Sequence, residues 1–256
     1  MANLDGLDIS ILGPAFAAGI LVLMTHVPLG REVIQRGIIF IDLAIAQFAG
    51  LGIIFAVTLG VEPHGLIIQL IAFVSALIGA LALGFAEKWL GQYQEALIGI
   101  AFSLAATGSI LLLANNPQGS EHLKDLLVGQ ILWVEWHQLI SPLLAALLIV
   151  SLWLWKRNVF RGKIFYVLFA IAITLSVQQV GIYLVFASLI IPALVTVKFA
   201  DKPALLFAFA VGVAGYLTGL IASAVLDLPS GAMIVWCLAL CAFLFACLTQ
   251  TIKIKT

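Results

Sequence analysis

Residues 164–197 read IFYVLFAIAITLSVQQVGIYLVFASLIIPALVTV, an apolar run interrupted near its middle by Gln178 and Gln179. A helix needs about 20 residues to cross the hydrocarbon core of a bilayer, so this run is too long for one crossing. We therefore predict two transmembrane helices joined by a tight turn at Gln178–Gly181. Backbone at membrane depth is tolerated only against protein or a water-filled cavity, which makes the two glutamines candidates for the lining of a path. The alternative is a turn at the outer surface.

The rest of the chain has the same apolar character. Of its 256 residues, 64% are hydrophobic and 9% are charged, and the mean hydropathy is +1.21. A water-soluble domain carries about 25% charged residues, so the composition excludes a soluble globular protein. The formal net charge is zero and there is no basic block, which argues against disorder and against nucleic-acid binding.

The apolar runs predict an all-α integral membrane bundle that forms a single domain over residues 1–256, with nine transmembrane helices. Apart from the connection at 115–138, the loops between these runs are short. The predicted helices are Ser10–His26, Gly37–Gly60, Leu66–Ala86, Ala96–Ala114, Leu139–Trp155, Ile164–Val177, Val180–Val197, Ala204–Val225 and Gly231–Thr249.

The positive charges predict how the bundle is oriented. Of the 12 lysines and arginines, all but Lys124 lie on alternate connections. Positive residues collect on the cytoplasmic side of membrane proteins, so we expect the N-terminus outside and the C-terminus in the cytoplasm. The cations predicted to be cytoplasmic are Arg31, Arg36, Lys88, Lys156, Arg157, Arg161, Lys163, Lys198, Lys202, Lys253 and Lys255.

The long outer connection, residues 115–138, has an amphipathic pattern. Leucines and other apolar residues between Leu123 and Val134 fall on one helical face, and Trp133 and Trp136 follow where an aromatic belt is expected. We predict an amphipathic helix that lies in the outer interface. It is either a structural lid on the bundle or a docking surface for an external partner.

Asp42 is the most informative polar residue. It is predicted to lie about one and a half turns into the second span, and a carboxylate there usually faces the bundle interior or a wet path. It is either a cation ligand or relay, or the partner of Arg36, Arg31 or Lys198 in a structural ion pair. Gln47, five residues later, is placed to hydrogen-bond a neighbouring helix.

The histidines form no obvious cluster. His26 ends the first predicted span and is interpreted as a polar cap rather than a ligand. His64 and His137, with Glu62 and Glu135 nearby, are predicted to lie outside and could touch an incoming cation. These are two separate pairs on different loops, and His122 stands apart from both, so they do not form a metal-site pattern.

Three further features concern packing. Pro192 lies inside the predicted seventh span, where it removes a backbone hydrogen bond and kinks the helix. Gly215 and Gly219 have the spacing that permits close helix approach. Cys237 and Cys241 share a helix face, so they are either a soft-metal pair or, as we prefer, apolar filler, as is Cys247.

Four segments, taken together and in order, resemble bacterial ABC permeases for zinc, manganese and iron. Gly30–Ala44 (GREVIQRGIIFIDLA) resembles the early loop and second helix of that family. Asp125–Val134 (DLLVGQILWV) is similar to its external loop. Val180–Ala193 (VGIYLVFASLIIPA) is similar to its most recognisable segment, and Leu228–Val235 (LPSGAMIV) to the start of its final helix.

The resemblance implies an importer of a divalent metal, zinc or manganese, in the bacterial cytoplasmic (inner) membrane. In that family two permease copies form a homodimeric pore among the membrane lipids, two cytoplasmic ATPases drive it, and an external substrate-binding protein delivers the metal. This chain has no glycine-rich phosphate loop, so we expect ATP hydrolysis on the partner, no enzymatic activity here and no cofactor.

The residue patterns above and the resemblance together give a set of expected roles. Asp42 is the expected metal ligand. The path would be lined by Asp42, Gln47, Gln178 and Gln179, and the packing residues would be Gly181, Pro192, Gly215 and Gly219. Docking of the binding protein is assigned to Asp125, Gly129, Trp133, Glu135 and Trp136, and contact with the ATPase to Arg157, Arg161 and Lys163.

Two departures from the family pattern keep other functions open. The family has a histidine four residues after the aspartate, and here that position is Ala46. The predicted cytoplasmic loop at 156–163 is also too short for the family's ATPase-binding helix. Coupling of this chain to the ATPase would therefore use a smaller contact, or another loop such as Glu87–Glu95. The alternatives are a permease of the same scaffold for a non-metal solute, an integral-membrane enzyme, or a membrane scaffold that does not transport.

Overall fold

The computed structural model describes residues 8–62, 65–114, 116, 126–155, 162 and 164–254, with only the backbone described at 201, 202 and 250–254. Within these ranges the chain is helical and contains no strand. The long helices are α1 (Ile9–Arg36), α2 (Ile41–Thr58), α3 (Leu66–Leu90), α4 (Gln94–Leu113), α6 (Ile140–Trp155), α7 (Ile164–Val180), α8 (Ile182–Val195), α9 (Asp201–Leu226) and α10 (Ser230–Ile254). Short 3-10 helices occur at Gly91–Tyr93, Ile131–Trp133 and Trp136–Leu139.

Six helical stretches in the described part of the chain are long and apolar enough to cross a membrane. One of them, Leu66–Leu113, contains both α3 and α4, while α7 and α8 are apolar but shorter than a full crossing. Each of the nine predicted segments overlaps a helix. The protein is therefore a multi-pass membrane protein, and the number of crossings and the side on which each terminus lies stay predictions.

The first helix is longer than its apolar run. The prediction that it ends at His26 is wrong, because α1 continues through Pro28 to Arg36. It stops where Gly37 adopts a φ of 70° and its backbone N–H bonds back to Val33 and Ile34, an arrangement that glycine favours at helix ends. The basic side chain of Arg36 in the last turn also suits the negative end of the helix dipole.

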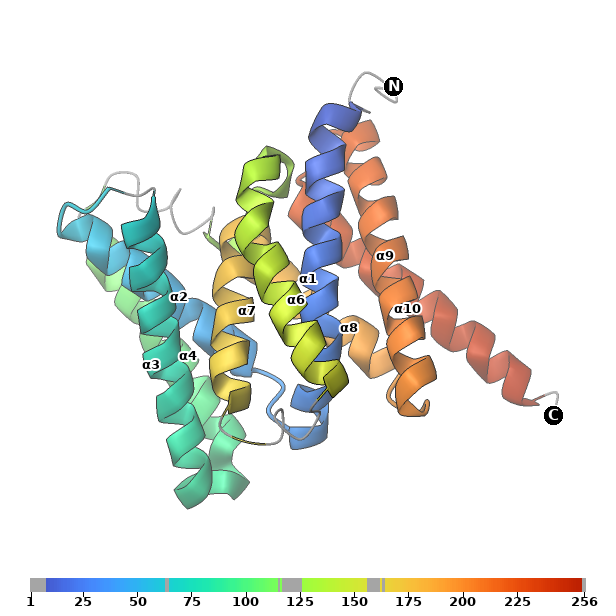
Figure 1. Ribbon diagram of the computed structural model, residues 1–256, viewed down its shortest axis with the longest axis horizontal. Coiled ribbons are helices and arrows are strands. Elements are labelled where there is room, and N and C mark those ends of the chain that lie inside the picture. Colours follow the sequence, from blue (N-terminus) through green and yellow to red (C-terminus); the bar gives the residue numbers. More distant parts are fainter. Residues whose placement is uncertain are drawn as a thin grey trace.

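The helices form two groups on either side of a central set (Figure 1). On one side α2 packs against α3 and α4, and on the other side α8, α9 and α10 pack together. Helix α1 lies between them and contacts α6, α7, α8 and α9, while α7 also contacts α2 and α3. The N-terminal end of α1 lies at the top of the view and its Arg36 end at the bottom, as the blue ribbon shows (Figure 1).

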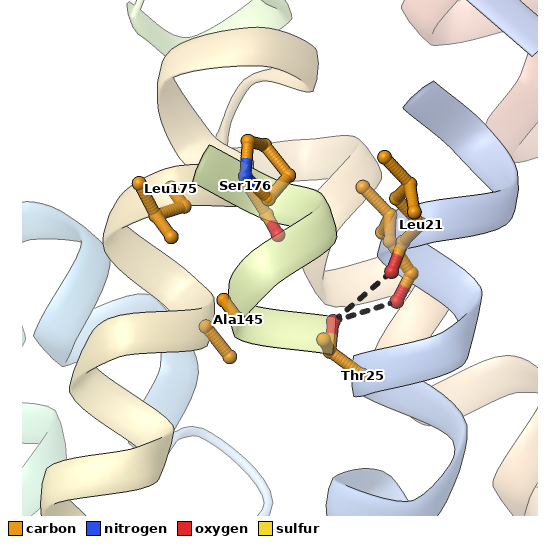
Figure 2. Close-up of a pocket in the computed structure, with 8 residues that line it drawn as sticks. Leu21, Thr25, Ala145, Leu175 and Ser176 are labelled. Carbon is orange, nitrogen blue, oxygen red and sulfur yellow. Dashed lines mark hydrogen bonds between the residues drawn. The ribbon is translucent and has the colours of Figure 1, made fainter. Parts of the chain in front are cut away.

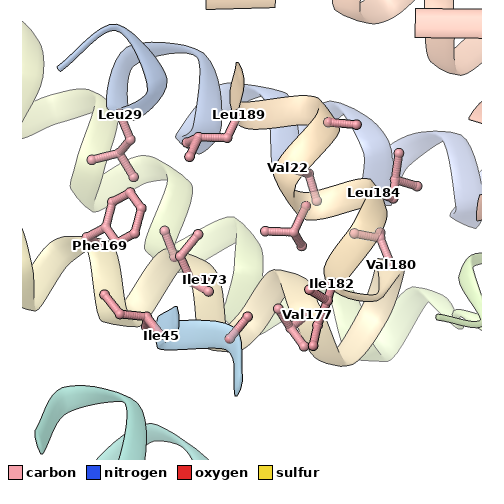
Figure 3. Packing of buried hydrophobic residues seen from close by; sticks show 14 of the residues in the cluster. Val22, Leu29, Ile45, Phe169, Ile173, Val177, Val180, Ile182, Leu184 and Leu189 are labelled. Carbon is pink, nitrogen blue, oxygen red and sulfur yellow. The ribbon is translucent and has the colours of Figure 1, made fainter. Parts of the chain in front are cut away.

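The core lies where α1, α2, α7 and α8 meet (Figure 3). Leu29 of α1, Ile45 of α2, Ile173 of α7 and Leu189 of α8 all belong to one buried apolar cluster. Helices α1 and α8 approach so closely that a methyl group at Gly30 would collide with the carbonyl of Leu189. Small residues permit this backbone contact, which is the usual basis of helix association in membranes.

The turn between α7 and α8 is tighter than predicted. Helix α7 continues through Gln179 to Val180, and α8 begins at Ile182, so Gly181 alone joins them with a φ of 78°. This turn packs against the outer connection, since a methyl group at Gly129 would collide with the backbone of Val180 and Gly181. The turn and the outer connection therefore lie at the same end of the bundle.

The predicted amphipathic helix in the outer connection is wrong for the residues that the structure describes there. Residues 126–128 are helical, but Gly129 has a φ of 70° and ends the helix. The chain continues as two 3-10 turns on either side of Val134 and Glu135. The burial pattern still follows the apolar face, because Ile131 and Val134 are buried.

Candidate functional site

Asp42 lies in the first turn of α2, and it is 1% exposed. The predicted depth of one and a half turns is wrong, because α1 continues to Arg36 and residues 37–40 form the connection, so that α2 begins only at Ile41. Neither carboxylate oxygen of Asp42 has a well-formed hydrogen bond among the described residues, and the only donors near them are the backbone N–H groups of Asp42 and Leu43 in the same helix turn. A buried carboxylate without partners is energetically costly, which marks this position as a candidate site.

A second carboxylate reaches the same helix end. Glu95, in the first turn of α4, accepts a hydrogen bond from the backbone N–H of Phe40 at 3.2 Å through its Oε1 atom. Phe40 is the N-cap residue of α2, and its side chain makes no capping bond. The free N–H groups and the dipole at a helix N-terminus favour negative charge. Both acidic side chains therefore occupy the end of α2 that tolerates them best.

The two arginines named in the ion-pair alternative, Arg31 and Arg36, have other partners. Arg31 donates from Nη1 to the carbonyl of Thr196 at 3.3 Å. Arg36 pairs with Glu32 at 3.2 Å, and its guanidinium lies 4.3 Å from the centre of the Phe165 ring. The hydrogen bond between Asp42 and a cation that the ion-pair alternative requires is absent from the part of the chain that the structure describes.

A polar network joins α3, α4 and α7 at this end of the bundle. Tyr166 donates its hydroxyl proton to Oε2 of Glu87 at 2.8 Å, and Gln94 donates from Nε2 to the Tyr166 oxygen at 3.0 Å. The guanidinium of Arg36 lies 5.9 Å from the Tyr166 ring centre. The first turns of α4 and α7 and the last turns of α1 and α3 are thus tied together close to the start of α2.

The comparison with protein families decides what kind of protein this is. The model of the ABC 3 transport family matches residues 8–164 and 158–250. This chain belongs to the ABC 3 transport family. It is therefore a membrane-spanning transport subunit and not an enzyme.

Curated relatives of this family member are named for metals. One is the high-affinity zinc uptake system membrane protein ZnuB of Haemophilus influenzae, 28% identical over 92% of this chain and 95% of the relative. Another is a probable iron transport system membrane protein of the same organism, 28% identical over 91% of each chain. The structure of PsaBC from Streptococcus pneumoniae in complex with Fab has the same fold, with a TM-score of 0.71, 20% identity and coverage of 94% and 93%.

The other predicted path residues lie apart from Asp42. Gln47 is buried further along α2. Gln178 is exposed, and Gln179 is 9% exposed and donates from Nε2 to the carbonyl of Gln138 at 3.2 Å. These two glutamines lie at the end of α7 opposite to Tyr166, next to the outer connection. In the transport subunit the predicted path residues therefore lie at different levels of the bundle.

His26 is not a polar cap. It lies within α1, is completely buried, and its Nδ1 atom is 2.9 Å from the carbonyl oxygen of Val22 and 2.8 Å from Oγ1 of Thr25. The prediction failed because α1 does not end there. Next to Thr25 a small cavity of about 10 Å³ lies between α1, α6 and α7, lined in part by Leu21, Ala145 and Ser176 (Figure 2). That volume has room for about one water molecule.

The other side chains that could bind a metal do not lie together at one site. His137 pairs with Glu135 of its own loop at 3.1 Å, and both side chains are 71% exposed. Among the residues whose side chains are described, no group of three or more histidines, cysteines, aspartates or glutamates could hold a metal ion. No disulfide joins Cys237, Cys241 and Cys247 in the described part of the chain. The predicted residues His64, His122, Asp125, Arg157, Arg161 and Lys163 lie outside the described residues.

The predicted docking and packing residues have clear positions in this family member. Trp133 and Trp136 are 79% and 62% exposed, whereas Gly129 faces the α7–α8 turn. Gly215 and Gly219 face α10, where an added methyl group would lie 2.5 Å from atoms of Leu238 and Ile234. Pro192 is buried inside α8, where its carbonyl accepts a hydrogen bond from the Thr196 hydroxyl at 3.0 Å.

Sequence reasoning missed Glu95. It was assigned to a polar connection with Glu87, because it follows the end of an apolar run and precedes the next one. The signal that could have found it is its position at the start of a predicted helix on the same side of the membrane as Asp42. Two acidic residues that begin neighbouring helices on one side are candidates for a shared site.

Proposed function

We propose that this chain is the membrane-spanning subunit of an ABC importer that carries a divalent metal ion across the bacterial inner membrane. The single observation that carries the proposal is the buried Asp42, whose two carboxylate oxygens have no hydrogen-bond partner. Ionisable groups inside membrane proteins are costly and usually mark ion pathways. The relatives named for zinc and iron support a metal as the cargo.

The position of Asp42 suits a cation that binds only transiently. A metal ion that enters the bundle loses water, and the buried carboxylate replaces part of that hydration. The N-terminus of α2 stabilises the carboxylate when no cation is present. The ion is therefore attracted by one charged group and released without a large penalty, as conduction through a selective path requires.

The two ends of the bundle would meet different partners. We place the external binding protein against the outer connection, where Trp133 and Trp136 expose aromatic surface beside Glu135. The ATPase would bind at the cytoplasmic end, through Arg157, Arg161 and Lys163. ATP binding and hydrolysis there would bias two arrangements of the bundle, and a second copy of this chain would complete the pore.

Uptake measurements test the metal and the role of Asp42. In cells that lack the chromosomal copy, Asp42→Asn should reduce accumulation of radioactive manganese and zinc at least about tenfold relative to the unaltered chain, as expected when a charged ligand is lost. The amount of protein in the membrane should be unchanged, because asparagine has nearly the same shape.

The matched control is Asp227→Asn. Asp227 is exposed and has a φ of 52° in the turn between α9 and α10, a conformation that asparagine adopts readily. This variant should transport normally. Normal metal uptake by the Asp42 variant would remove Asp42 from the path.

The absence of a histidine at Ala46 favours a second candidate, a permease of the same scaffold for a non-metal solute. Ala46 is 1% exposed and lies one helical turn from Asp42. The total metal content of cells that lack the chain distinguishes the two. A fall in manganese or zinc supports the metal importer, and unchanged contents of both under metal limitation support the other solute.

A further inference from the structure

Three carboxylate oxygens are buried at one place without a hydrogen-bond partner in the described part of the chain. They are Oδ1 and Oδ2 of Asp42 and Oε2 of Glu95. More than nine in ten buried polar groups in proteins have such a partner, and buried anions are costly. These oxygens therefore require a ligand or a compensating charge.

The two carboxylates face the same helix end. Glu95 reaches from α4 to the backbone N–H of Phe40, which is two residues before Asp42. Helices α2 and α4 pack along one another, and Glu95 is close enough to Asp42 for their charges to interact. The helix N-terminus offers only about half of one positive charge, which does not neutralise two carboxylates.

A divalent cation fits this arrangement better than a proton shared by the two acids. A shared proton would join one oxygen of Asp42 to Oε2 of Glu95 and leave the other Asp42 oxygen without a partner. A divalent ion would neutralise both charges and contact oxygens of both side chains. The donors here are oxygens alone, since the residue one turn after Asp42 is the buried Ala46. Such donors suit hard ions such as Mn²⁺, whereas zinc sites usually include nitrogen or sulfur.

We propose that Glu95 and Asp42 together form the cation site of this transporter, with carboxylate oxygens as its protein ligands. This inference rests on the proposed function and adds to it a second ligand. Since no third acidic, histidine or cysteine side chain among the described residues completes the set, water supplies the remaining coordination. Two protein ligands give a site weak enough for the ion to leave.

Electron paramagnetic resonance tests the site with Mn²⁺ itself as the probe. Free Mn²⁺ in water gives a sharp signal that weakens on binding, so a titration of the full-length protein in detergent measures affinity. Glu95→Gln keeps an oxygen for the Phe40 N–H and removes the charge. It should weaken Mn²⁺ binding at least about tenfold, because even residues behind metal ligands have effects of that size.

Glu87→Gln is the matched control. Glu87 lies at the same end of the bundle and accepts a bond from Tyr166 at 2.8 Å, and an amide oxygen can still accept that bond. Its Mn²⁺ affinity should stay within about twofold of the unaltered protein. A loss of affinity in Glu87→Gln as large as in Glu95→Gln would contradict a site built from Glu95.

The outcomes separate the inference from the proposed function. If Asp42→Asn abolishes manganese uptake but Glu95→Gln binds and transports Mn²⁺ normally, the inference is wrong and the importer stands. If both variants transport manganese normally, the path does not use this site.

Discussion

The two ends of the helix bundle are stabilised in different ways. At the end that is predicted to be outside, Gly129 and Gly181 let the outer connection pack backbone to backbone against the α7–α8 turn, and the amide of Gln179 donates to Gln138. At the other end, Asp42 and Glu95 hold buried oxygens that have no partner among the described residues. The amide oxygen of Gln179 is also buried without a partner among the described residues, so the two ends differ in charge: the first packs neutral groups, while the end at α2 buries carboxylates at the cost of stability.

Of the substitutions that test this difference between the two ends, Gly181→Ala should have the largest effect on folding. The added methyl group would collide with the backbone of Val128 and Gly129, and the φ of 78° is strained for alanine. We expect almost no folded protein, measured as the monodisperse fraction in size-exclusion chromatography from detergent.

The control for this substitution is Gly60→Ala. Gly60 has a φ of 87°, but nothing lies within 4 Å of an added methyl group. Gly60→Ala should therefore be destabilised only by the strain of a left-handed backbone conformation, about 1–2 kcal/mol. Equal yields of the two variants would show that the contact between the outer connection and the turn contributes nothing.

Tyr166→Phe should have an intermediate effect at the opposite end. It removes the hydroxyl that bonds to Glu87 at 2.8 Å and to Gln94 at 3.0 Å. We expect a loss of about 1–3 kcal/mol in the free energy of unfolding, measured by denaturant titration in detergent. A neutral result would mean that this network does not hold α3, α4 and α7 together.

Asp42→Asn should have a small effect on stability and with the reverse sign. Its carboxylate has no hydrogen-bond partner to lose, and a neutral amide is less costly to bury. We expect an unchanged or slightly higher unfolding temperature, measured by differential scanning fluorimetry in the absence of divalent ions. A lower temperature would show that the carboxylate stabilises the fold and would weaken the contrast between the two ends.

Trp136→Ala should have the smallest effect on folding. The side chain is 62% exposed, although its ring edge comes near Gly13 of α1. Stability should change by less than about 1 kcal/mol, while binding of the external substrate-binding protein, measured by surface plasmon resonance, should weaken about tenfold or more. Ser103→Ala is a control on the exposed side of α4. Unchanged binding would move the docking surface away from this tryptophan.

The sequence was sufficient to place helices over all nine apolar segments, because hydrophobic length is a property of the sequence alone. It was also sufficient to locate the turn before Ile182. Helix ends were less predictable, because α1 continues as a helix through the polar turn at Gly30–Arg36. That error placed His26 at a helix end and Asp42 too deep in α2.

Of the two acidic residues at the candidate site, only one could be predicted from the sequence. Asp42 stood out because a carboxylate in an apolar run is rare. Glu95 did not, because its contact with Phe40 joins residues from different helices and depends on how α2 and α4 pack. The end of the helix at Gly129 could not be predicted either, because the apolar spacing around it fits a continuous helix. Only the contact with Gly181 shows why glycine is required at this position.

The lengths of α1 and α8 have a consequence for the surrounding lipid. Helix α1 has 28 residues and is about 42 Å long, whereas α8 has 14 and is about 21 Å long. A bilayer's hydrocarbon layer is about 30 Å thick, so α1 must tilt or protrude, while α8 alone cannot reach from one interface to the other. Most of α8 is buried among other helices, so the mismatch that the lipid must accommodate arises at longer helices such as α1. Transport rates should consequently depend on the acyl-chain length of the lipids in which the protein is reconstituted.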